Sequence, residues 1–430
     1  IQTILHDVVH FVDQEDKRSD FLDKIFLHPV FGLVSLAVMM FVVFQAVFAW
    51  AAPFMDGIES LFGWLGEVIG ENISHPLLNS LIVDGIIAGA GGVVVFLPQI
   101  LILFLFILIL EESGYLPRAA FLLDKLMFSA GLSGRAFIPL LSSFACAVPG
   151  IMATRSIADP RDRLTTIMVA PLMTCSARLP VYALLIAAFI PNQTVWGMFN
   201  LQGLVLFGLY MAGIVSALGV SFVLKFLQKD KSEHVLLMEL PSYRFPDLKS
   251  VWIGLLDRAK IFLKRVGGII FALSILLWFL CTFPQPPEGA TMPAIDYSFA
   301  GMLGHVLQPI FAPVGFNWQI VIALIPAMAA REVVVAALGT VYALSAVDED
   351  AMSQGLAALI SGGGELGWSL ATGLSLLVWF IYAPHCLATL ATVKRETGSW
   401  RTVSIMTCYL FGLAYFMSFL TYQTASYLLG

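Results

Sequence analysis

Charged residues are scarce in this sequence. Only 12% of its 430 residues are charged, whereas 59% are hydrophobic, and a typical soluble domain carries roughly 25% charged residues. This scarcity argues against an ordinary water-soluble domain and indicates that lipid surrounds most of the chain. Because a helix needs about 20 apolar residues to cross a bilayer, the length leaves room for about eight spans. The net charge of -6 also gives no support for a nucleic-acid partner, which a strongly basic surface would attract.

Lysine and arginine are absent from one long stretch and from several loops. None occurs between residues 25 and 117, nor in the loops at 284–297 and 345–365, which carry acidic residues instead. Basic residues gather elsewhere, as in 155–163 and 225–265. Since the cytoplasmic loops of membrane proteins are enriched in Lys and Arg, we expect the basic segments in the cytoplasm and the acidic loops outside.

Several signatures of enzymes and metal sites are also missing. The sequence has no G-x-x-x-x-G-K-[ST] phosphate loop, no H-E-x-x-H pair and no G-x-S-x-G elbow, which mark common nucleotide-binding and hydrolytic sites. We therefore expect no enzyme activity and no tightly bound cofactor in this chain. Five cysteines are present without a C-x-x-C pair, and an odd number within apolar segments does not indicate a disulfide framework. They are Cys146, Cys175, Cys281, Cys386 and Cys408.

Long apolar runs are what the sequence has in abundance. We expect transmembrane helices at 30–51, 93–110, 164–190, 200–227, 266–283, 298–312 with 316–343, 367–393 and 402–427. A shorter apolar segment, 76–92, holds a glycine cluster and predicts a re-entrant piece or a packed helix. Residues 57–72 carry apolar residues on one face and acidic residues elsewhere, which is typical of a helix lying at the membrane surface.

The most distinctive pattern is a duplication. Segments 121–150 and 302–341 align when Gly131 is placed on Gly315. Each then consists of an amphipathic helix, a glycine turn and a second helix interrupted by proline or small residues. We therefore expect two structural repeats, one in each half of the chain.

A second matched pair lies downstream of the first. VAPLMTCSARLPVY (169–182) resembles YAPHCLATLATVKR (382–395), and each has an Ala-Pro step followed by a cysteine. Proline inside a span removes a helical hydrogen bond and leaves carbonyls and helix ends free within the membrane. Such groups can bind an ion, and paired repeats can move around that site. The duplicated breaks therefore predict a transporter.

Three cysteines lie beside the predicted breaks and are candidate metal ligands. Cys146 and Cys175 belong to the first half of the chain, and Cys386 belongs to the second. Thiolates favour Fe(II), Cu(I) and Zn(II) over Mg(II) and Ca(II), although a free cysteine is ordinarily a small, buried packing residue. Cys281 and Cys408 lie within spans away from the breaks, and we interpret them as packing residues.

Glu332 is the fourth candidate ligand. It lies in the otherwise apolar segment IPAMAAREVVVAALG, and an ionisable group inside a span indicates a functional site. The alternative interpretations are a local ion pair with Arg331 or a position near the membrane surface. Asp84 and His385 are further candidates of the same kind.

Four segments carry a resemblance to a known family. They are SLIVDGIIAGAGGVVVFLPQILILF (80–104), GLSGRAFIPLLSSFACAVPGIMATR (131–155), AAREVVVAALGTVYAL (329–344) and YAPHCLATLATVKRE (382–396). They resemble the membrane domain of the FeoB family of bacterial ferrous iron transporters, in the order found there. The duplicated segments are similar to the two Gate motifs of that family.

This resemblance implies a fold and a location. We expect an all-α polytopic membrane protein of the bacterial inner membrane, with about eight transmembrane helices and two Gate-type repeats containing broken or re-entrant helices. Residues 1–24 would end a cytoplasmic helical linker domain, and 25–227 would form the first transmembrane half. Residues 228–265 would be a basic cytoplasmic linker, and 266–430 the second half.

The resemblance also implies a function and partners. We expect import of Fe(II) as the transported substrate, with Cys146, Cys175, Glu332 and Cys386 as metal ligands. A GTP-binding domain that uses GTP and Mg would precede Ile1 and gate or drive the import. Small Feo accessory proteins and a homo-oligomer are further expected partners.

Two other functions fit the same pattern. A nucleoside-type solute carrier could share the gate architecture, and its transport would compete with nucleosides and ignore metal. A non-conducting membrane scaffold or receptor could signal the nucleotide state, and it would give no flux in liposomes.

Overall fold

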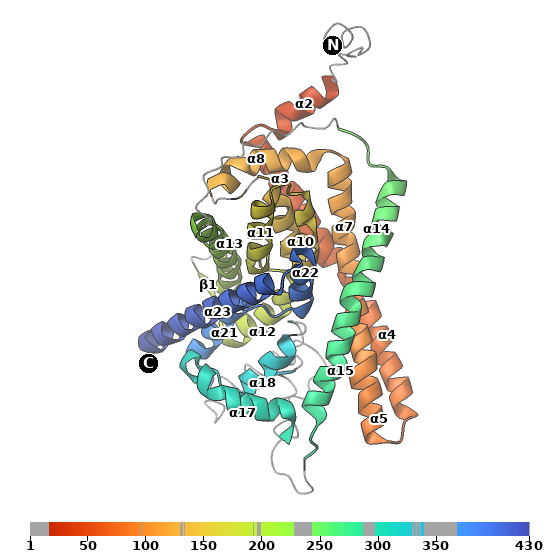
Figure 1. The fold of residues 1–430 in the computed structure, drawn as a ribbon, viewed down its shortest axis with the longest axis vertical. Helices are drawn as coiled ribbons and strands as arrows, with labels where there is room; N and C mark the ends of the chain where they lie inside the picture. Colours follow the sequence, from red (N-terminus) through yellow and green to blue (C-terminus); the bar gives the residue numbers. More distant parts are fainter. Residues whose placement is uncertain are drawn as a thin grey trace.

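The structure, a computed structural model, is almost entirely helical over the residues it describes. These are 17–95, 97–129, 132, 134–191, 193–195, 199–227, 243–286, 297–328, 331, 334, 337–338 and 368–429. Within them, strands are limited to β1 (Thr194–Val195) and β2 (Phe199–Asn200), which pair antiparallel. The predicted all-α class is therefore confirmed (Figure 1).

The N-terminal part of the chain forms two long helical runs. The first contains α2 (Lys17–Phe26), α3 (Phe31–Gln45), the π-helix η1 (Ala46–Trp50) and α4 (Ala52–Glu71). The second contains α5 (Pro76–Ser80), the π-helix η2 (Leu81–Ile87), α6 (Ala88–Val94) and α7 (Leu97–Glu112). The segment 76–92 is helical and forms part of one candidate span with α7, which fits the expected packed helix.

The glycine cluster explains how these helices pack. A Cβ atom on Gly91 would lie 3.0 Å from the Phe62 ring of α4, and one on Gly89 would lie 2.9 Å from Cβ of Ser274. Small residues let helix backbones approach closely in a membrane protein. Gly89 and Gly91 therefore allow close packing of α6 against α4 and α15 (Gly268–Thr282).

The first repeat lies in the middle of the chain. It contains α8 (Tyr115–Ser129), η3 (Gly134–Ala136), α9 (Phe137–Ala145), α10 (Ala147–Ala153), η4 (Thr154–Ser156), α11 (Pro160–Val169), η5 (Ala170–Leu172), η6 (Ser176–Arg178) and α12 (Leu179–Phe189). The long helix α13 (Leu201–Leu227) follows. The helix breaks at Cys146 but continues through Pro139, which occupies the first turn of α9, where a missing N–H has little cost.

The second half begins with a long rod of α14 (Leu248–Phe262), the π-helix η7 (Leu263–Gly267) and α15 (Gly268–Thr282), drawn in green in Figure 1. It continues with α17 (Phe299–Phe311), η8 (Ala312–Val314), α18 (Trp318–Ala327), α21 (Leu370–Tyr382), α22 (Leu387–Thr397) and α23 (Trp400–Leu429). The segment formed by α17 and η8 is bent by 106° relative to α18. Gly315 makes this bend with a left-handed φ of 84°, which glycine adopts without strain. The equivalent Gly131 lies outside the described residues.

Fewer helices than expected are long enough to cross a bilayer. The described residues contain five candidate spans, or six if the bent pair counts as one, so the expected number of about eight is not confirmed. Breaks divide several apolar segments into shorter helices, as at Cys146 and Gly315. An apolar run in the sequence therefore does not always form one uninterrupted crossing.

Both halves of the chain share one hydrophobic core. It contains buried residues from the first repeat, such as Tyr182 and Leu185, together with Ile320 and Phe380 from the second half. α21 packs extensively against α23, and α10 packs against α22 near the centre of the molecule (Figure 1). The broken helices of the two halves therefore meet inside the protein.

Candidate ion-binding site

Cys146 occupies the break in the first broken helix. α9 ends at Ala145, Cys146 is extended with φ of -155° and ψ of 132°, and α10 begins at the next residue. Pro149 accounts for this break, because it has no N–H to donate to the Ala145 carbonyl four residues earlier. α9 and α10 then pack closely at Gly150, where a side chain would collide with Ser143. The half-buried thiol of Cys146 therefore lies between two helix ends.

The second break of the first half is closed by an arginine. Cys175 is 8% exposed and lies in the extended stretch between η5 and η6. The fully buried guanidinium of Arg178 donates hydrogen bonds to three carbonyls exposed by this break. These are the carbonyls of Pro171 at 3.0 Å, Met173 at 3.1 Å and Leu172 at 3.4 Å. In contrast to our expectation, they are occupied by a side chain rather than free for an ion.

Cys386 occupies the matching break in the second half. It is the N-cap residue of α22, in an extended conformation with φ of -167° and ψ of 95°. The Leu387 N–H donates to the Met328 carbonyl at 3.1 Å, which ties this break to the end of α18. The neighbouring His385 accepts a hydrogen bond at Nε2 from the indole N–H of Trp379 at 2.7 Å. That nitrogen is therefore not available to a metal in this arrangement.

Arg331 joins the breaks of the two halves. Its side chain is only 4% exposed. Its Nε donates to the carbonyl of His385 at 2.9 Å, and one terminal nitrogen contacts the sulfur of Cys175 at 3.4 Å. A hydrogen bond with a charged donor is stronger than a neutral one. A guanidinium therefore occupies the space between the Cys175 thiol and the loop that carries Cys386.

The three candidate cysteines lie in the same region of the protein. Cys146 and Cys386 pack against one apolar cluster, and Arg331 links the Cys175 sulfur to the carbonyl of His385, the residue before Cys386. Within the described part of the chain, however, no three His, Cys, Asp or Glu residues are arranged to hold a metal ion. The structure therefore brings together the cysteines of both halves without a closed coordination shell.

The two acidic candidates for the site are Glu332 and Asp84. Glu332 lies outside the described residues, so its role stays a prediction. Asp84 lies in η2, where its carboxylate accepts a hydrogen bond from Ser80 Oγ at 2.8 Å.

Cys281 is a half-buried residue of α15, and Cys408 is an exposed residue of α23, and neither lies at a helix break.

Two buried arginines were missed as members of the site. Arg178 and Arg331 contact the residues around Cys175, yet the sequence analysis did not select either as a candidate. The signal was present, because a charged residue within an apolar segment indicates a functional or structural site inside the membrane. Both arginines sit within such segments.

Family comparisons support the duplicated architecture. The Gate family, described as "Nucleoside recognition", matches residues 93–189 and 263–400. The family described as "Ferrous iron transport protein B C terminus" matches residues 206–258. Since the Gate match has one segment in each half, the prediction of Gate-type repeats is confirmed. No solved structure matches the chain significantly.

Similar proteins carry the name FeoB. The Fe(2+) transporter FeoB of Leptospira interrogans serovar copenhageni is 44% identical over 413 residues, covering 93% of this chain and 59% of that protein. The protein of the same name from Staphylococcus aureus strain COL is 37% identical over 439 residues, covering 98% and 62%. A fusion protein from Porphyromonas gingivalis, named Fe(2+) transport protein A/Fe(2+) transporter FeoB, is 38% identical over 440 residues, covering 94% and 51%.

These relatives are longer than the present chain. The chain spans between 51% and 62% of the length of the three relatives described above. The matched region nevertheless includes nearly all of this chain and both of its broken-helix repeats. The resemblance inferred from the sequence is therefore confirmed: the chain belongs to the FeoB family and is a multi-pass protein of the bacterial inner membrane.

Proposed function

We propose that this chain is a membrane domain that carries Fe(II) across the bacterial inner membrane. One observation supports this proposal most strongly. Cysteines from both halves, Cys146 and Cys175 on one side and Cys386 on the other, lie at helix breaks that the apolar cluster and Arg331 connect. Fe(II) accepts thiolate ligands, and relatives of this chain carry the name Fe(2+) transporter.

The proposed binding step uses residues from both repeats. Fe(II) enters from the outer side, loses water and binds between the repeats. The ligands are Cys146, Cys175, Cys386 and Glu332. For the cation to reach Cys175, the guanidinium of Arg331 has to move away from the sulfur that it contacts at 3.4 Å. A relative movement of the two repeats would then open the site to the cytoplasm, as in other transporters with paired broken helices.

Additional domains and proteins complete the proposal. A GTP-binding domain outside these 430 residues gates or drives the movement of the repeats. A small accessory protein also acts with the transporter, since one relative is a fusion of Fe(2+) transport protein A with FeoB. Both partners would act on the membrane domain from the cytoplasmic side.

A second candidate function is transport of a nucleoside-type solute. Two observations favour it: the Gate family is described as "Nucleoside recognition", and Arg178 and Arg331 place two buried guanidinium groups beside the helix breaks. A buried guanidinium is a good partner for an anionic or polar organic solute. Transport of Fe(II) explains the cysteine thiols at these helix breaks better than transport of a nucleoside does.

A flux assay separates the candidates. The full-length protein is reconstituted in liposomes, and Fe(II) entry is measured with Zn(II), Mn(II) or a nucleoside as competitor. We expect Fe(II) flux that ignores the nucleoside and falls at least about tenfold in Cys146→Ser and Cys386→Ser, because mutation of a group that merely orients a metal ligand already costs about 10–100-fold in affinity or activity, and loss of the ligand itself should cost no less.

Cys281→Ser and Cys408→Ser are the matched controls, since these cysteines lie away from the helix breaks. Both are expected to retain Fe(II) flux. Flux of a nucleoside in place of iron would establish the second candidate. Absence of any flux would favour a non-conducting scaffold or receptor.

A further inference from the structure

A cavity lies between α7, α10, α14 and α22. Its volume is about 70 Å³, counted as room for the centres of water-sized molecules, and it is partly open to the outside. The apolar part of its wall is formed by Ile100, Phe104, Val148, Pro149, Met152, Ile261, Phe262, Ala388 and Ala391. The polar part is formed by Arg258, Thr392, Arg395 and Glu396. The cavity is therefore apolar along most of its wall and charged at one end.

This cavity begins beside the candidate cysteines. α10 starts directly after Cys146 and α22 starts directly after Cys386, and Val148 and Ala388 line the cavity from the first turns of these helices. Both cysteines pack against the same apolar cluster that contains Val148 and Ala388. From there the wall follows α22 to its last turn, at Glu396. The cavity thus connects the helix breaks with the far ends of α10 and α22.

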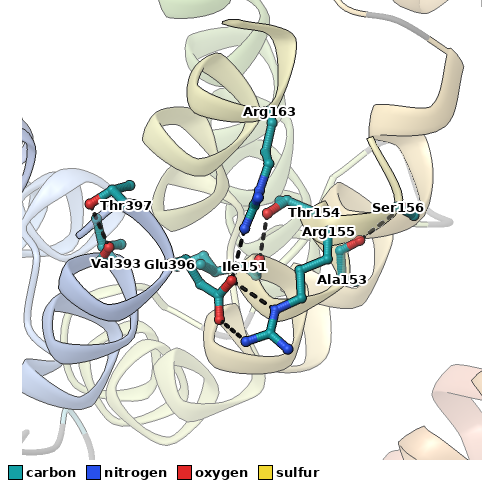
Figure 2. Close-up of polar contacts among 9 residues, drawn as sticks. All are labelled: Ile151, Ala153, Thr154, Arg155, Ser156, Arg163, Val393, Glu396 and Thr397. Carbon is teal, nitrogen blue, oxygen red and sulfur yellow. Dashed lines mark hydrogen bonds and ion pairs between the residues drawn. The ribbon is translucent and has the colours of Figure 1, made fainter. Parts of the chain in front are cut away.

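An ion-pair cluster lies at that end of α22 (Figure 2). The carboxylate of Glu396 accepts hydrogen bonds from Arg155 Nε at 2.9 Å, from a terminal nitrogen of Arg155 at 2.6 Å and from Arg163 at 2.9 Å. Arg155 lies in η4 and Arg163 in α11, whereas Glu396 lies in α22. The Glu396 side chain is only 3% exposed. The cluster therefore links the first repeat to the second through charge-assisted hydrogen bonds, which are the stronger kind.

The charges around this end repel a cation. Arg258 and Arg395 line the cavity together with Glu396, and Arg155 and Arg163 pair with the Glu396 carboxylate. The cavity and its ion-pair cluster therefore carry four guanidinium groups and one carboxylate, and an excess of arginine in a narrow passage is an electrostatic barrier to cations. Both 155–163 and 394–401 are basic segments, which places this end in the cytoplasm by the positive-inside rule.

The geometry points to this cavity as the inner passage of the transported cation, with Glu396, Arg155 and Arg163 as its cytoplasmic gate. The identity of the cargo rests on the function proposed above. When Glu396 separates from the two arginines, α22 loses its ion pairs with η4 and α11, and a free carboxylate becomes available to a cation at this end. The thioether of Met152 and the hydroxyl of Thr392 then offer weak ligands along the passage.

Labelling of a cysteine inside the cavity tests this inference without iron. Ala391→Cys is introduced into the full-length protein in inside-out membrane vesicles. A small, membrane-impermeant, zwitterionic thiol reagent without net charge is added, so that the arginine excess does not itself set the rate, and modification of residue 391 is measured by site-resolved mass spectrometry. We expect slow labelling with the gate intact. Labelling is expected to be about tenfold faster with Glu396→Gln, because the charge-assisted hydrogen bonds of the gate are lost.

Arg155→Gln provides a second variant, since this side chain is 56% exposed and its replacement should not prevent folding. Arg155→Gln should accelerate labelling of residue 391 by a smaller factor than Glu396→Gln. Arg155→Lys, which keeps the positive charge, should leave labelling slow. The matched control is Asp23→Asn, which breaks the ion pair of Asp23 with Arg118 far from the cavity. This control should leave the labelling rate unchanged.

Equal labelling rates with and without Glu396→Gln would overturn the gate, and no labelling from the cytoplasmic side would overturn the passage. Failure of the cargo proposal is distinguishable from both. Glu396-dependent labelling in a protein without Fe(II) flux would support the gate and contradict iron as the cargo.

Discussion

The two proline breaks that carry Cys175 and Cys386 are closed in different ways. In the first half, the carbonyls exposed at 171–173 bind Arg178, which belongs to the same segment. In the second half, local hydrogen bonds join the His385 N–H to the Ala383 carbonyl and the Cys386 N–H to the Pro384 carbonyl. Distant residues hold the break at 383–386 as well: Met328 accepts from Leu387, and Arg331 donates to His385. A break closed within its own segment can stay rigid. One held by residues from elsewhere can change when those residues move, so we infer that the second half is the part that rearranges.

The largest effect is expected at the self-contained break. Arg178→Met removes the donor for three buried carbonyls and should lower stability by about 3 kcal/mol, since each buried acceptor left unpaired costs roughly 1–3 kcal/mol. Thermal unfolding of the purified protein in detergent measures this. A melting temperature equal to that of the unchanged protein would show that the first break does not depend on Arg178.

A smaller effect is expected at the bend of the second half. Gly315→Ala places a side chain at φ of 84° and against the ring of Tyr422 in α23. The expected loss of stability is about 2 kcal/mol, because a left-handed conformation of a non-glycine residue and a steric collision both raise the energy. Gly412→Ala is the control, since that glycine has open space around it. Equal melting temperatures for Gly315→Ala and Gly412→Ala would show that stability does not depend on a glycine at this bend against α23.

The smallest effect is expected at the contact between the halves. Arg331→Met removes one hydrogen bond to the His385 carbonyl and one contact to Cys175, so we expect a loss of about 1 kcal/mol. The same unfolding measurement compares it directly with Arg178→Met. A loss as large as that of Arg178→Met would mean that both breaks are equally fixed, and the proposed difference between the halves would be wrong.

Much of the fold could be predicted because its signals are local. Pro149 removes the hydrogen-bond donor to Ala145, so a break near Cys146 followed from the sequence alone. The bend at Gly315 followed in the same way from a glycine turn. The number of spans could not be predicted from the sequence, because short helices on either side of a break have the same composition as an uninterrupted span.

The site was harder to predict because it depends on distant contacts. The pairing of Arg331 with Cys175, and of Glu396 with Arg155 and Arg163, joins residues far apart in the chain. Hydropathy and periodicity report which residues face lipid or protein, but they do not report which buried side chains meet. The cysteines were found because their breaks are local features, whereas their arginine partners were not.

Metal binding by the purified protein tests the central claim that cysteines from both halves share one cation site. Co(II), a spectroscopic substitute for Fe(II), is titrated into the full-length protein in detergent, and the thiolate-to-metal absorption band is recorded. We expect a band that is weakened, at the same Co(II) concentration, in Cys146→Ser and in Cys386→Ser and unchanged in Cys281→Ser and Cys408→Ser. A band of undiminished intensity in both Cys146→Ser and Cys386→Ser, or the absence of any band in the unchanged protein, would contradict the claim.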